Sequence, residues 1–317
     1  MGHPLSLPRF PRYPCWQGPV RGPKGDRMDF KALLMGLAFA FMWSSAFTSA
    51  RMIVVDAPPL LSLSARFLIS GLIGVALARL MGETWRLTRA QWRATIIFGI
   101  CQNGAYLGLN FIAMQWIEAS AAAIIASTLP LLVALAGFVF FGDRLKPLAI
   151  AGLVAGFGGV ILIMGARLGG GLDPVGVTLC VLAAMALTVA TLALRGASSG
   201  GNVMMVVGLQ MLIGSAVLIG PSLAFETLSV NVTPRLILAF LYTTLVPGLA
   251  ATWVWFKLVQ RIGAVRGATF HFLNPFFGVA IAAALLGETL GVVDIIGVVI
   301  IMAGILAVQL SKAPPAR

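Results

Sequence analysis

The sequence predicts an all-α integral membrane protein whose ten transmembrane helices form two inverted five-helix repeats, with both chain ends in the cytoplasm. The 317 residues are 59% hydrophobic and only 10% charged, and their mean hydropathy is +0.99. A water-soluble domain of this composition would expose large apolar patches. Apolar stretches of about 20 residues recur along the chain, each long enough to cross a hydrocarbon core of about 30 Å. The second half of the chain also repeats the first.

The ten apolar stretches are joined by short connections, so no soluble domain is inserted between them. They cover residues 31–52, 60–80, 94–116, 119–141, 147–166, 174–195, 203–223, 234–258, 263–287 and 291–311. Each is a continuous apolar run, whereas the strands of a membrane β-barrel would alternate polar and apolar residues over about ten positions. The pattern is therefore typical of membrane helices.

The segment before the first helix has a different composition. Residues 1–30 contain many Pro, Gly and Arg residues and no apolar run, so we expect a disordered extension. Met28 directly precedes the first helix and is a plausible alternative start to Met1. A cleaved signal peptide is the rival interpretation, but its removal would leave the first repeat incomplete.

The duplication is clearest at the ends of the fourth and ninth helices, where a proline is followed by a glycine and an acidic residue. The matching residues are 145 positions apart: Pro130 and Pro275, Gly142 and Gly287, Asp143 and Glu288. Five helices per repeat is an odd number, so the second copy must cross the membrane in the opposite sense. We assign residues 31–166 and 174–311 to the two repeats and 312–317 to a cytoplasmic tail. Many secondary transporters are built from such inverted repeats.

The basic residues predict the orientation. A net charge of +12 would suggest a nucleic-acid partner in a soluble protein, but its placement here points to the membrane. With both ends inside, only Arg51, Arg167 and Arg235 of the 22 Lys and Arg residues fall outside, and Arg66 lies within a helix. The positive-inside rule favours this topology. We therefore expect no nucleic-acid partner.

Several motifs together resemble the EamA-type transporters of the drug/metabolite transporter superfamily. They are the paired corners, Arg66 in an Ala-Arg-Phe-Leu context, Gln210, and the segment 255–264, and the resemblance covers about residues 31–311. One departure is Asp143, where the family more often has Glu. The resemblance implies export of small organic solutes, amino acids included. It also implies a central cavity lined by helices one to four and six to nine, with helices five and ten at the periphery.

Polar and aromatic side chains within the apolar stretches are the candidate cavity residues, because polar groups in hydrocarbon require a partner or a wet cavity. Helix three presents a polar stripe on one face. The full set of candidates is Trp43, Arg66, Asn103, Tyr106, Asn110, Ser127, Gln210, Tyr242, Trp253, His271 and Asn274. The alternative for each polar residue is a structural hydrogen bond between helices.

Arg66 has two interpretations. Its guanidinium can hold a substrate carboxylate through two parallel hydrogen bonds. Alternatively it pairs with backbone carbonyls or a loop carboxylate, which we favour slightly, because family members with varied substrates share this arginine. Its counterpart in the second repeat is Gln210.

The two helix prolines and one histidine carry predictions about motion and coupling. Pro130 and Pro275 each remove a helical hydrogen bond, so we expect hinges that gate the cavity, with static kinks as the alternative. His271 is the mid-membrane side chain whose unperturbed pKa lies nearest neutrality, and no carboxylate lies deep in a helix. We therefore expect weak or absent proton coupling. The aromatic residues suit flat or apolar-bodied solutes, such as aromatic amino acids, or cations.

The expected function is secondary transport of small organic metabolites, with the lipid bilayer of the cell's inner membrane as surroundings. A drug or nucleotide-sugar carrier, a polar-lined channel and an intramembrane enzyme remain as alternatives. We expect no enzymatic activity, cofactor or metal, since no Walker motif, catalytic dyad or metal-ligand spacing is found. The glycines of helices five and ten permit close helix contact, either within a monomer or across a homodimer.

Overall fold

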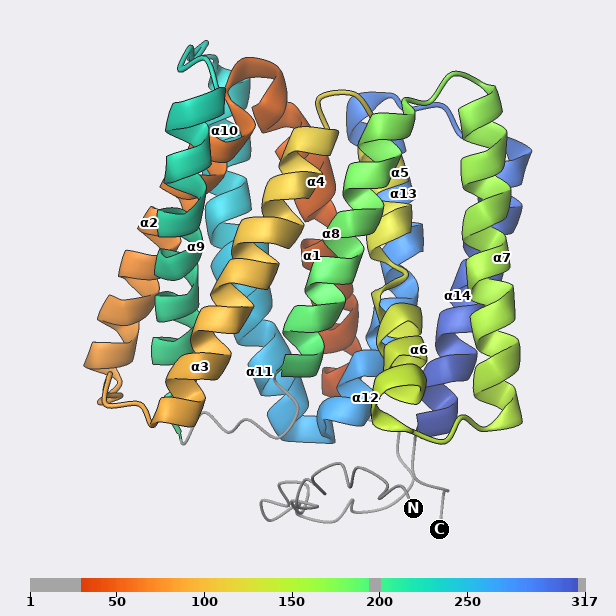
Figure 1. The fold of residues 1–317 in the computed structure, drawn as a ribbon, viewed down its shortest axis with the longest axis horizontal. Coiled ribbons are helices and arrows are strands. Elements are labelled where there is room, and N and C mark those ends of the chain that lie inside the picture. The colour runs from red at the N-terminus through yellow and green to blue at the C-terminus, as the bar shows by residue number, and fades with distance from the viewer. Residues whose placement is uncertain (1–29, 194–200, 313–317) are drawn as a thin grey trace, which may run out of the picture.

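The computed structural model describes residues 30–193 and 201–312, which form helices and connecting loops without a strand (Figure 1). Ten helical spans in this part of the chain are long and apolar enough to cross a membrane. The predicted all-α fold with ten membrane-spanning helices is therefore confirmed. The predicted disordered extension, apart from Phe30, lies outside the described residues, as does most of the predicted tail.

Six of the ten spans are single helices. They are α1 (Phe30–Asp56), α2 (Pro59–Leu80), α7 (Pro147–Gly169), α8 (Pro174–Ala193), α9 (Val203–Phe225) and α14 (Val292–Lys312). Three of them begin with proline, whose fixed φ suits the first helical turn and whose missing N–H would have no partner there. In Figure 1, α1 begins and α14 ends at the bottom of the bundle, which we call the lower end.

The other four spans are interrupted, and the interruptions occur in pairs related by the repeat. The third span contains α3 (Arg89–Phe98), the π-helix η1 (Gly99–Tyr106) and α4 (Leu107–Ala113). The eighth contains α10 (Pro234–Thr243), the π-helix η2 (Thr244–Ala250) and α11 (Ala251–Ile262). The two π-helices start 145 residues apart, at Gly99 and Thr244.

The fourth and ninth spans are broken in front of the two predicted hinge prolines. The fourth consists of α5 (Ala119–Ala126) and α6 (Leu129–Phe141); the ninth consists of α12 (Ala264–Thr269), the 3₁₀ turn η3 (Phe270–Leu273) and α13 (Asn274–Leu286). Pro130 and Pro275 are the second residues of α6 and α13. Each proline lacks a backbone N–H, so the helical hydrogen bond to the preceding turn is missing and each helix restarts there.

The glycines of the two corners end α6 and α13 in left-handed geometry. Gly142 has φ +67° and Gly287 has φ +69°. Residues other than glycine adopt this conformation only with strain. The glycine of the repeated Gly-acidic pattern therefore ends each helix.

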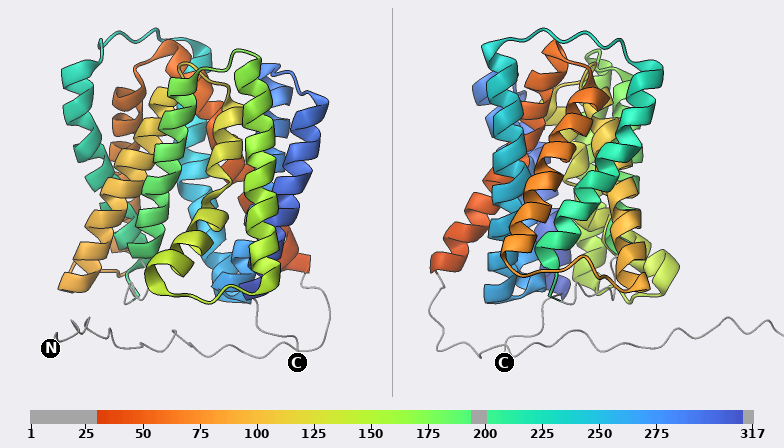
Figure 2. Two further views of the ribbon diagram at one scale, coloured as in Figure 1. Left: turned by 45° about the vertical axis from the view of Figure 1, so that its right-hand side comes forward. Right: turned by 90° about the vertical axis from the view of Figure 1, so that its left-hand side faces the viewer.

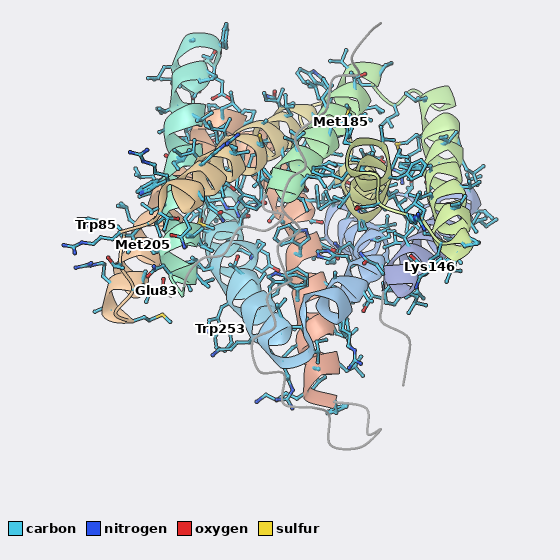
Figure 3. The ribbon with its side chains drawn as sticks, turned by 60° about the horizontal axis from the view of Figure 1, so that its bottom comes forward. Glu83, Trp85, Lys146, Met185, Met205 and Trp253 are labelled. Carbon is cyan, nitrogen blue, oxygen red and sulfur yellow. The ribbon has the colours of Figure 1, made fainter. Side chains whose placement is uncertain are left out.

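Acidic residues from one repeat cap helices of the other. Glu288 accepts hydrogen bonds from the backbone N–H groups of Ala119 and Ser120, at 2.8 and 3.0 Å. Glu226 does the same at the start of α2, at 2.7 and 2.9 Å. Glu83 accepts from the N–H of Met205 at the start of α9, at 2.7 Å, and the two lie side by side in Figure 3. Each carboxylate complements the positive end of a helix dipole and ties the two repeats together.

Matching helices of the two repeats pack against each other, α2 along α9 and α7 along α14 (Figure 1 and Figure 2). The α7–α14 contact is closest where Gly152 faces Gly304. A Cβ on either residue would lie 2.6 Å from the carbonyl oxygen of the other. The sequence left open whether these glycines pack within a monomer or across a dimer; the structure uses them within the chain.

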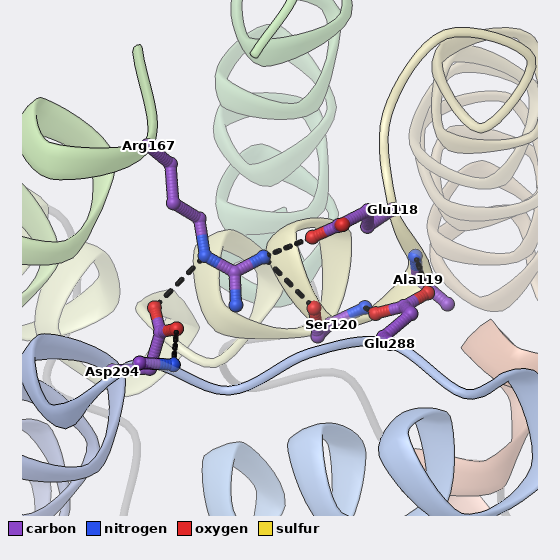
Figure 4. Close-up of polar contacts among 7 residues, drawn as sticks. Glu118, Ala119, Ser120, Arg167, Glu288 and Asp294 are labelled. Carbon is purple, nitrogen blue, oxygen red and sulfur yellow. Dashed lines mark hydrogen bonds and ion pairs between the residues drawn. The ribbon is translucent and has the colours of Figure 1, made fainter. Parts of the chain in front are cut away.

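A second arginine, Arg167 at the end of α7, ties three helices together at the upper end (Figure 4). Its Nε donates to Asp294 at 2.9 Å and its Nη1 to Ser120 at 2.9 Å, and Nη1 also pairs with Glu118. The Asp294 side chain is 10% exposed and that of Glu118 46%. Burial raises the pKa of Glu118 more than Arg167 lowers it, with Glu288 and Asp294 raising it further. Because its side chain is the less exposed of the two, Asp294 is the more constrained partner of Arg167.

Candidate functional site

Two adjoining cavities lie in the middle of the bundle, between the repeats. The larger has a volume of about 540 Å³ and the smaller about 70 Å³. Four residues line both: Trp43, Gln102, Gln210 and Thr252. Together the cavities are lined by spans one to four and six to nine, and α7 and α14 contribute no lining residue. This arrangement is the one that the family resemblance implied.

The polar wall of the smaller cavity is built by η1 and α4. Asn103 and Tyr106 come from η1 and Asn110 from α4, so the predicted stripe does face one cavity. Side chains of this polar stripe also form hydrogen bonds with backbone carbonyls of the protein. Asn103 Nδ2 donates to the carbonyl of Gln210 at 2.8 Å, and Asn110 Nδ2 donates to the carbonyl of Tyr106 at 2.8 Å. Asn103 therefore ties η1 to α9, and Asn110 ties α4 to α8, because its Oδ1 accepts from Cys180 Sγ at 3.3 Å.

Arg66, on α2, is the one arginine or lysine among the described residues that line either cavity. The residue is only 6% exposed, and its Nε is buried without a hydrogen-bond partner. The centre of the guanidinium lies 5.2 Å from the ring centroid of Phe67. Among the described residues, no carboxylate lies within ion-pairing distance of Arg66. A buried, uncompensated guanidinium is energetically unfavourable, so its retention needs an explanation.

The larger cavity has an aromatic wall. The rings of Phe39 and Trp255 lie 4.8 Å apart, and the ring of His271 lies 5.3 Å from Phe39 and 5.4 Å from Trp255. His271 Nδ1 accepts a hydrogen bond from Asn274 Nδ2 at 2.9 Å, which leaves the proton of a neutral imidazole on Nε2. No acidic residue lines this cavity or the smaller one.

The larger cavity extends toward the lower end of the bundle. It is lined by Gln91 near the start of α3, Thr191 near the end of α8 and Val203 at the start of α9, and all three helix ends lie there (Figure 1). The smaller cavity lies above it and is lined by Ala50 and Met114. The two cavities together therefore form a pathway from the lower end to the middle of the bundle.

Several predicted cavity residues line neither cavity. Tyr242 donates to or accepts from Ser45 at 2.8 Å, joining α10 to α1. Ser127 donates to the carbonyl of Ile124 at 2.6 Å, at the break between α5 and α6. The Asn274 carbonyl accepts from Ser44 at 3.2 Å, so Asn274 adjoins the larger cavity through its bond to His271.

Trp253 was also a predicted cavity residue, but it is 55% exposed and points away from the bundle (Figure 3). Its ring centroid lies 5.9 Å from Lys257 Nζ. The π-helix η2 has more residues per turn than an α-helix, so it rotates α11 relative to the pattern assumed from the sequence. Thr252 and Trp255 line the cavities instead. Pro247, within η2, was the sequence signal for this change of phase.

Comparison with known proteins gives a family match to both halves of the chain. The model of the EamA-like transporter family matches residues 30–165 and again residues 174–310. The two matched regions coincide with the two sets of five spans.

Relatives and a solved structure extend this match. The uncharacterized transporter YvbV of Bacillus subtilis is 27% identical over 284 residues, covering 88% of this chain and 92% of YvbV. The aromatic amino acid exporter YddG of Ancylobacter novellus is 30% identical over 139 residues, which is 44% of this chain and 48% of YddG. A solved crystal structure superposes with a TM-score of 0.65 at 21% identity, covering 88% of this chain and 98% of the other. This last likeness supports the fold alone.

Proposed function

The chain belongs to the EamA-like transporter family, and from this premise we propose that it is a secondary carrier that exports small organic solutes from the cytoplasm. The observation that carries the proposal is a cavity in mid-bundle that is lined by both repeats and extends toward one end. A carrier works by exposing such a site to the two sides in turn.

The two ends of the bundle differ in a way that supports alternating access. At the upper end, Arg51 hydrogen-bonds the carbonyl of Met114, Glu288 caps α5, and Arg167 joins three helices. At the lower end, the larger cavity lies between the ends of α3, α8 and α9. Positive-inside counting makes the lower end cytoplasmic, so the conformation fits a cytoplasm-facing state of the cell's inner membrane.

The interrupted spans are the elements that we expect to move. The breaks in front of Pro130 and Pro275 leave short helix segments that can pivot without breaking a continuous helix. Because the breaks are related by the repeat, one can open its end while the other closes. Exchange of these two arrangements would carry the solute across.

Amino acids with apolar or aromatic side chains are the substrates that we propose. The aromatic wall of the larger cavity suits them, and one relative that matches less than half of this chain is named an aromatic amino acid exporter. A nucleotide-sugar would need several cations for its diphosphate, and among the described lining residues Arg66 is the one arginine or lysine. Since His271 has no carboxylate beside it among the lining residues, we propose that translocation needs no proton gradient.

Counterflow in proteoliposomes tests this proposal. Vesicles loaded with a mixture of unlabelled amino acids should accumulate labelled phenylalanine or leucine transiently, without a pH gradient. Transient accumulation is the signature of a carrier, which a channel does not produce. Absence of counterflow for every amino acid, with and without a pH gradient, would remove amino acids from the proposal; linear, non-saturating entry would replace the carrier with a channel.

A further inference from the structure

We propose that Arg66 binds the free carboxylate of the transported solute in the smaller cavity, while the apolar body of the same solute occupies the larger cavity. This inference rests on the proposed carrier function and names the chemical class that the carrier accepts, a solute with one carboxylate next to an apolar or aromatic group.

Arg167 shows what a structural role looks like in this chain, and Arg66 differs from it. Arg167 is met by two carboxylates and a hydroxyl group. Each arginine has one buried nitrogen without a partner, Nε of Arg66 and Nη2 of Arg167. The difference is that no carboxylate among the described residues pairs with Arg66, which lies deeper in its helix. A guanidinium carries five N–H donors in a planar fork that fits a carboxylate. The missing partner of Arg66 is therefore an anion of that shape.

A second unpartnered group lies beside Arg66. Ser70, one helical turn further along α2, is buried with its Oγ unbonded. Both side chains face Gly248 of η2, where an added Cβ would lie 3.4 Å from Arg66 Nη2 and 3.7 Å from Ser70 Oγ. The same Cβ would lie 3.2 Å from the carbonyl oxygen of Thr243, so the gap at Gly248 holds no more than one carbon. Arg66 and Gly248 line the smaller cavity and Ser70 does not, so Arg66 is the donor that an anionic group in the cavity would meet.

The volumes of the two cavities indicate which part of the solute each one can hold. A single water needs about 15 Å³ of such volume, so about 70 Å³ holds a carboxylate and a few waters but not an amino acid. The larger cavity, of about 540 Å³, has the aromatic wall. Since Trp43 and Gln210 line both, a solute can extend from Arg66 into the larger space.

The charge of the lining also selects against cations. Neither cavity is lined by an acidic residue, and Arg66 repels a positive group. The ammonium of a zwitterion would have to rest on the ring of Trp43 or on amide oxygens. Carboxylates should therefore bind more tightly than amines of the same size.

Binding of matched probes to the purified protein tests the inference. Dissociation constants are measured by calorimetry for 3-phenylpropionate, 3-phenylpropanamide, L-phenylalanine and phenethylamine. We expect wild-type protein to bind 3-phenylpropionate at least about tenfold more tightly than the amide, which corresponds to about 1.4 kcal/mol. Arg66→Gln should abolish this ratio. Arg79→Gln, an exposed arginine on the same helix, should retain it.

The thermal unfolding midpoint of ligand-free protein provides a second readout. Removing an arginine that holds the fold together would lower this midpoint. If Arg66 serves the solute, Arg66→Gln should unfold at the same or a higher temperature than wild type, because a buried uncompensated charge is removed. A lower midpoint together with an unchanged binding ratio would show a structural role and overturn the inference.

The inference and the carrier proposal fail separately. Equal counterflow of phenethylamine and 3-phenylpropionate, in wild type and Arg66→Gln alike, would leave the carrier intact and overturn the role of Arg66. If wild-type protein binds 3-phenylpropionate no more tightly than 3-phenylpropanamide, the role of Arg66 is likewise overturned. Loss of all counterflow with a preserved tenfold ratio in binding would instead overturn the carrier and keep the anion site.

Discussion

At the residue scale, the contrast between Arg167 and Arg66 separates groups that hold the fold from groups that await a ligand. Arg167 neutralises Asp294, whose other oxygen accepts from the N–H of Gly291 at the start of α14. Removing the arginine leaves that carboxylate nearly buried without its cation. An orphaned buried charge is among the most destabilising changes that a single substitution can make.

Arg167→Gln should therefore destabilise the protein by about 3 kcal/mol, the lower part of the range for breaking a buried ion pair, because Glu118 is half-exposed. Thermal unfolding in detergent measures the effect. Arg235→Gln, an exposed arginine at the start of α10, is the control and should leave the midpoint unchanged. Equal midpoints for the two variants would contradict the bracing role of Arg167.

Trp253 and Trp255 allow a matched test of the aromatic wall. Trp255→Ala should raise the KM for an aromatic solute about threefold to tenfold, since an aromatic contact contributes about 0.5–1.5 kcal/mol. Trp253→Ala should leave the KM unchanged, because Trp253 faces away from both cavities. A larger effect from Trp253 would mean that α11 is rotated in the transporting state.

At this scale, the sequence was enough to predict which residue types line the cavities, but not which hydrogen-bond partners those residues have. The polarity of Asn103 and Tyr106 in an apolar stretch was enough to find the smaller cavity. The bond from Asn103 to the carbonyl of Gln210 joins residues more than 100 positions apart, which no local pattern records. Likewise, helical periodicity wrongly predicted that Trp253 faces the cavity, because it assumed an unbroken α-helix through Pro247.

At the element scale, length and hydropathy suffice for the spans, whereas the interruptions depend on local chemistry and packing. The predicted range 203–223 agrees closely with α9 (Val203–Phe225). Pro247 was a sequence signal for η2, but η1 contains no proline and had no comparable signal; η1 packs against α8 and α9. Packing between elements therefore decides what the sequence pattern leaves open.

The α7–α14 contact is sensitive to small changes in volume. Gly304→Ala places a Cβ 2.6 Å from the Gly152 carbonyl oxygen and the Gly156 nitrogen, so the helices must separate. We expect a loss of about 1–3 kcal/mol. Gly158→Ala is the control on the same helix pair, because a Cβ there meets nothing within 4 Å. Measured unfolding midpoints should fall for the first variant alone.

The hinge role assigned to Pro130 and Pro275 predicts a defect in rate. Replacing both by Ala lets each span continue as a regular helix across the break, which should slow the exchange between conformations. We expect at least a tenfold lower counterflow rate, with binding of the solute retained. An unchanged rate in the double variant would show that the breaks are static kinks.

At the scale of the whole molecule, orientation follows from the ends of a single helix. Lys146 precedes α7 at the lower end and Gly170 follows it at the upper end, and both residues are exposed. In a chain whose native cysteines are replaced by serine, we expect Gly170→Cys to react with a membrane-impermeant reagent on intact cells. Lys146→Cys should react only after the membrane is opened. The reverse labelling would invert the proposed topology and turn the cavity toward the exterior.

The paired interruptions have a consequence for the history of the chain. Both halves carry a π-helix at the same position, and both carry a break in front of the same proline, always 145 residues apart. Two independent acquisitions of an extra residue at equivalent sites would be a coincidence. Duplication of one five-helix unit that already carried the π-helix and the break accounts for all four interruptions at once. Such a polypeptide could assemble a central cavity only by pairing with an oppositely inserted copy of itself, which gene fusion later made permanent.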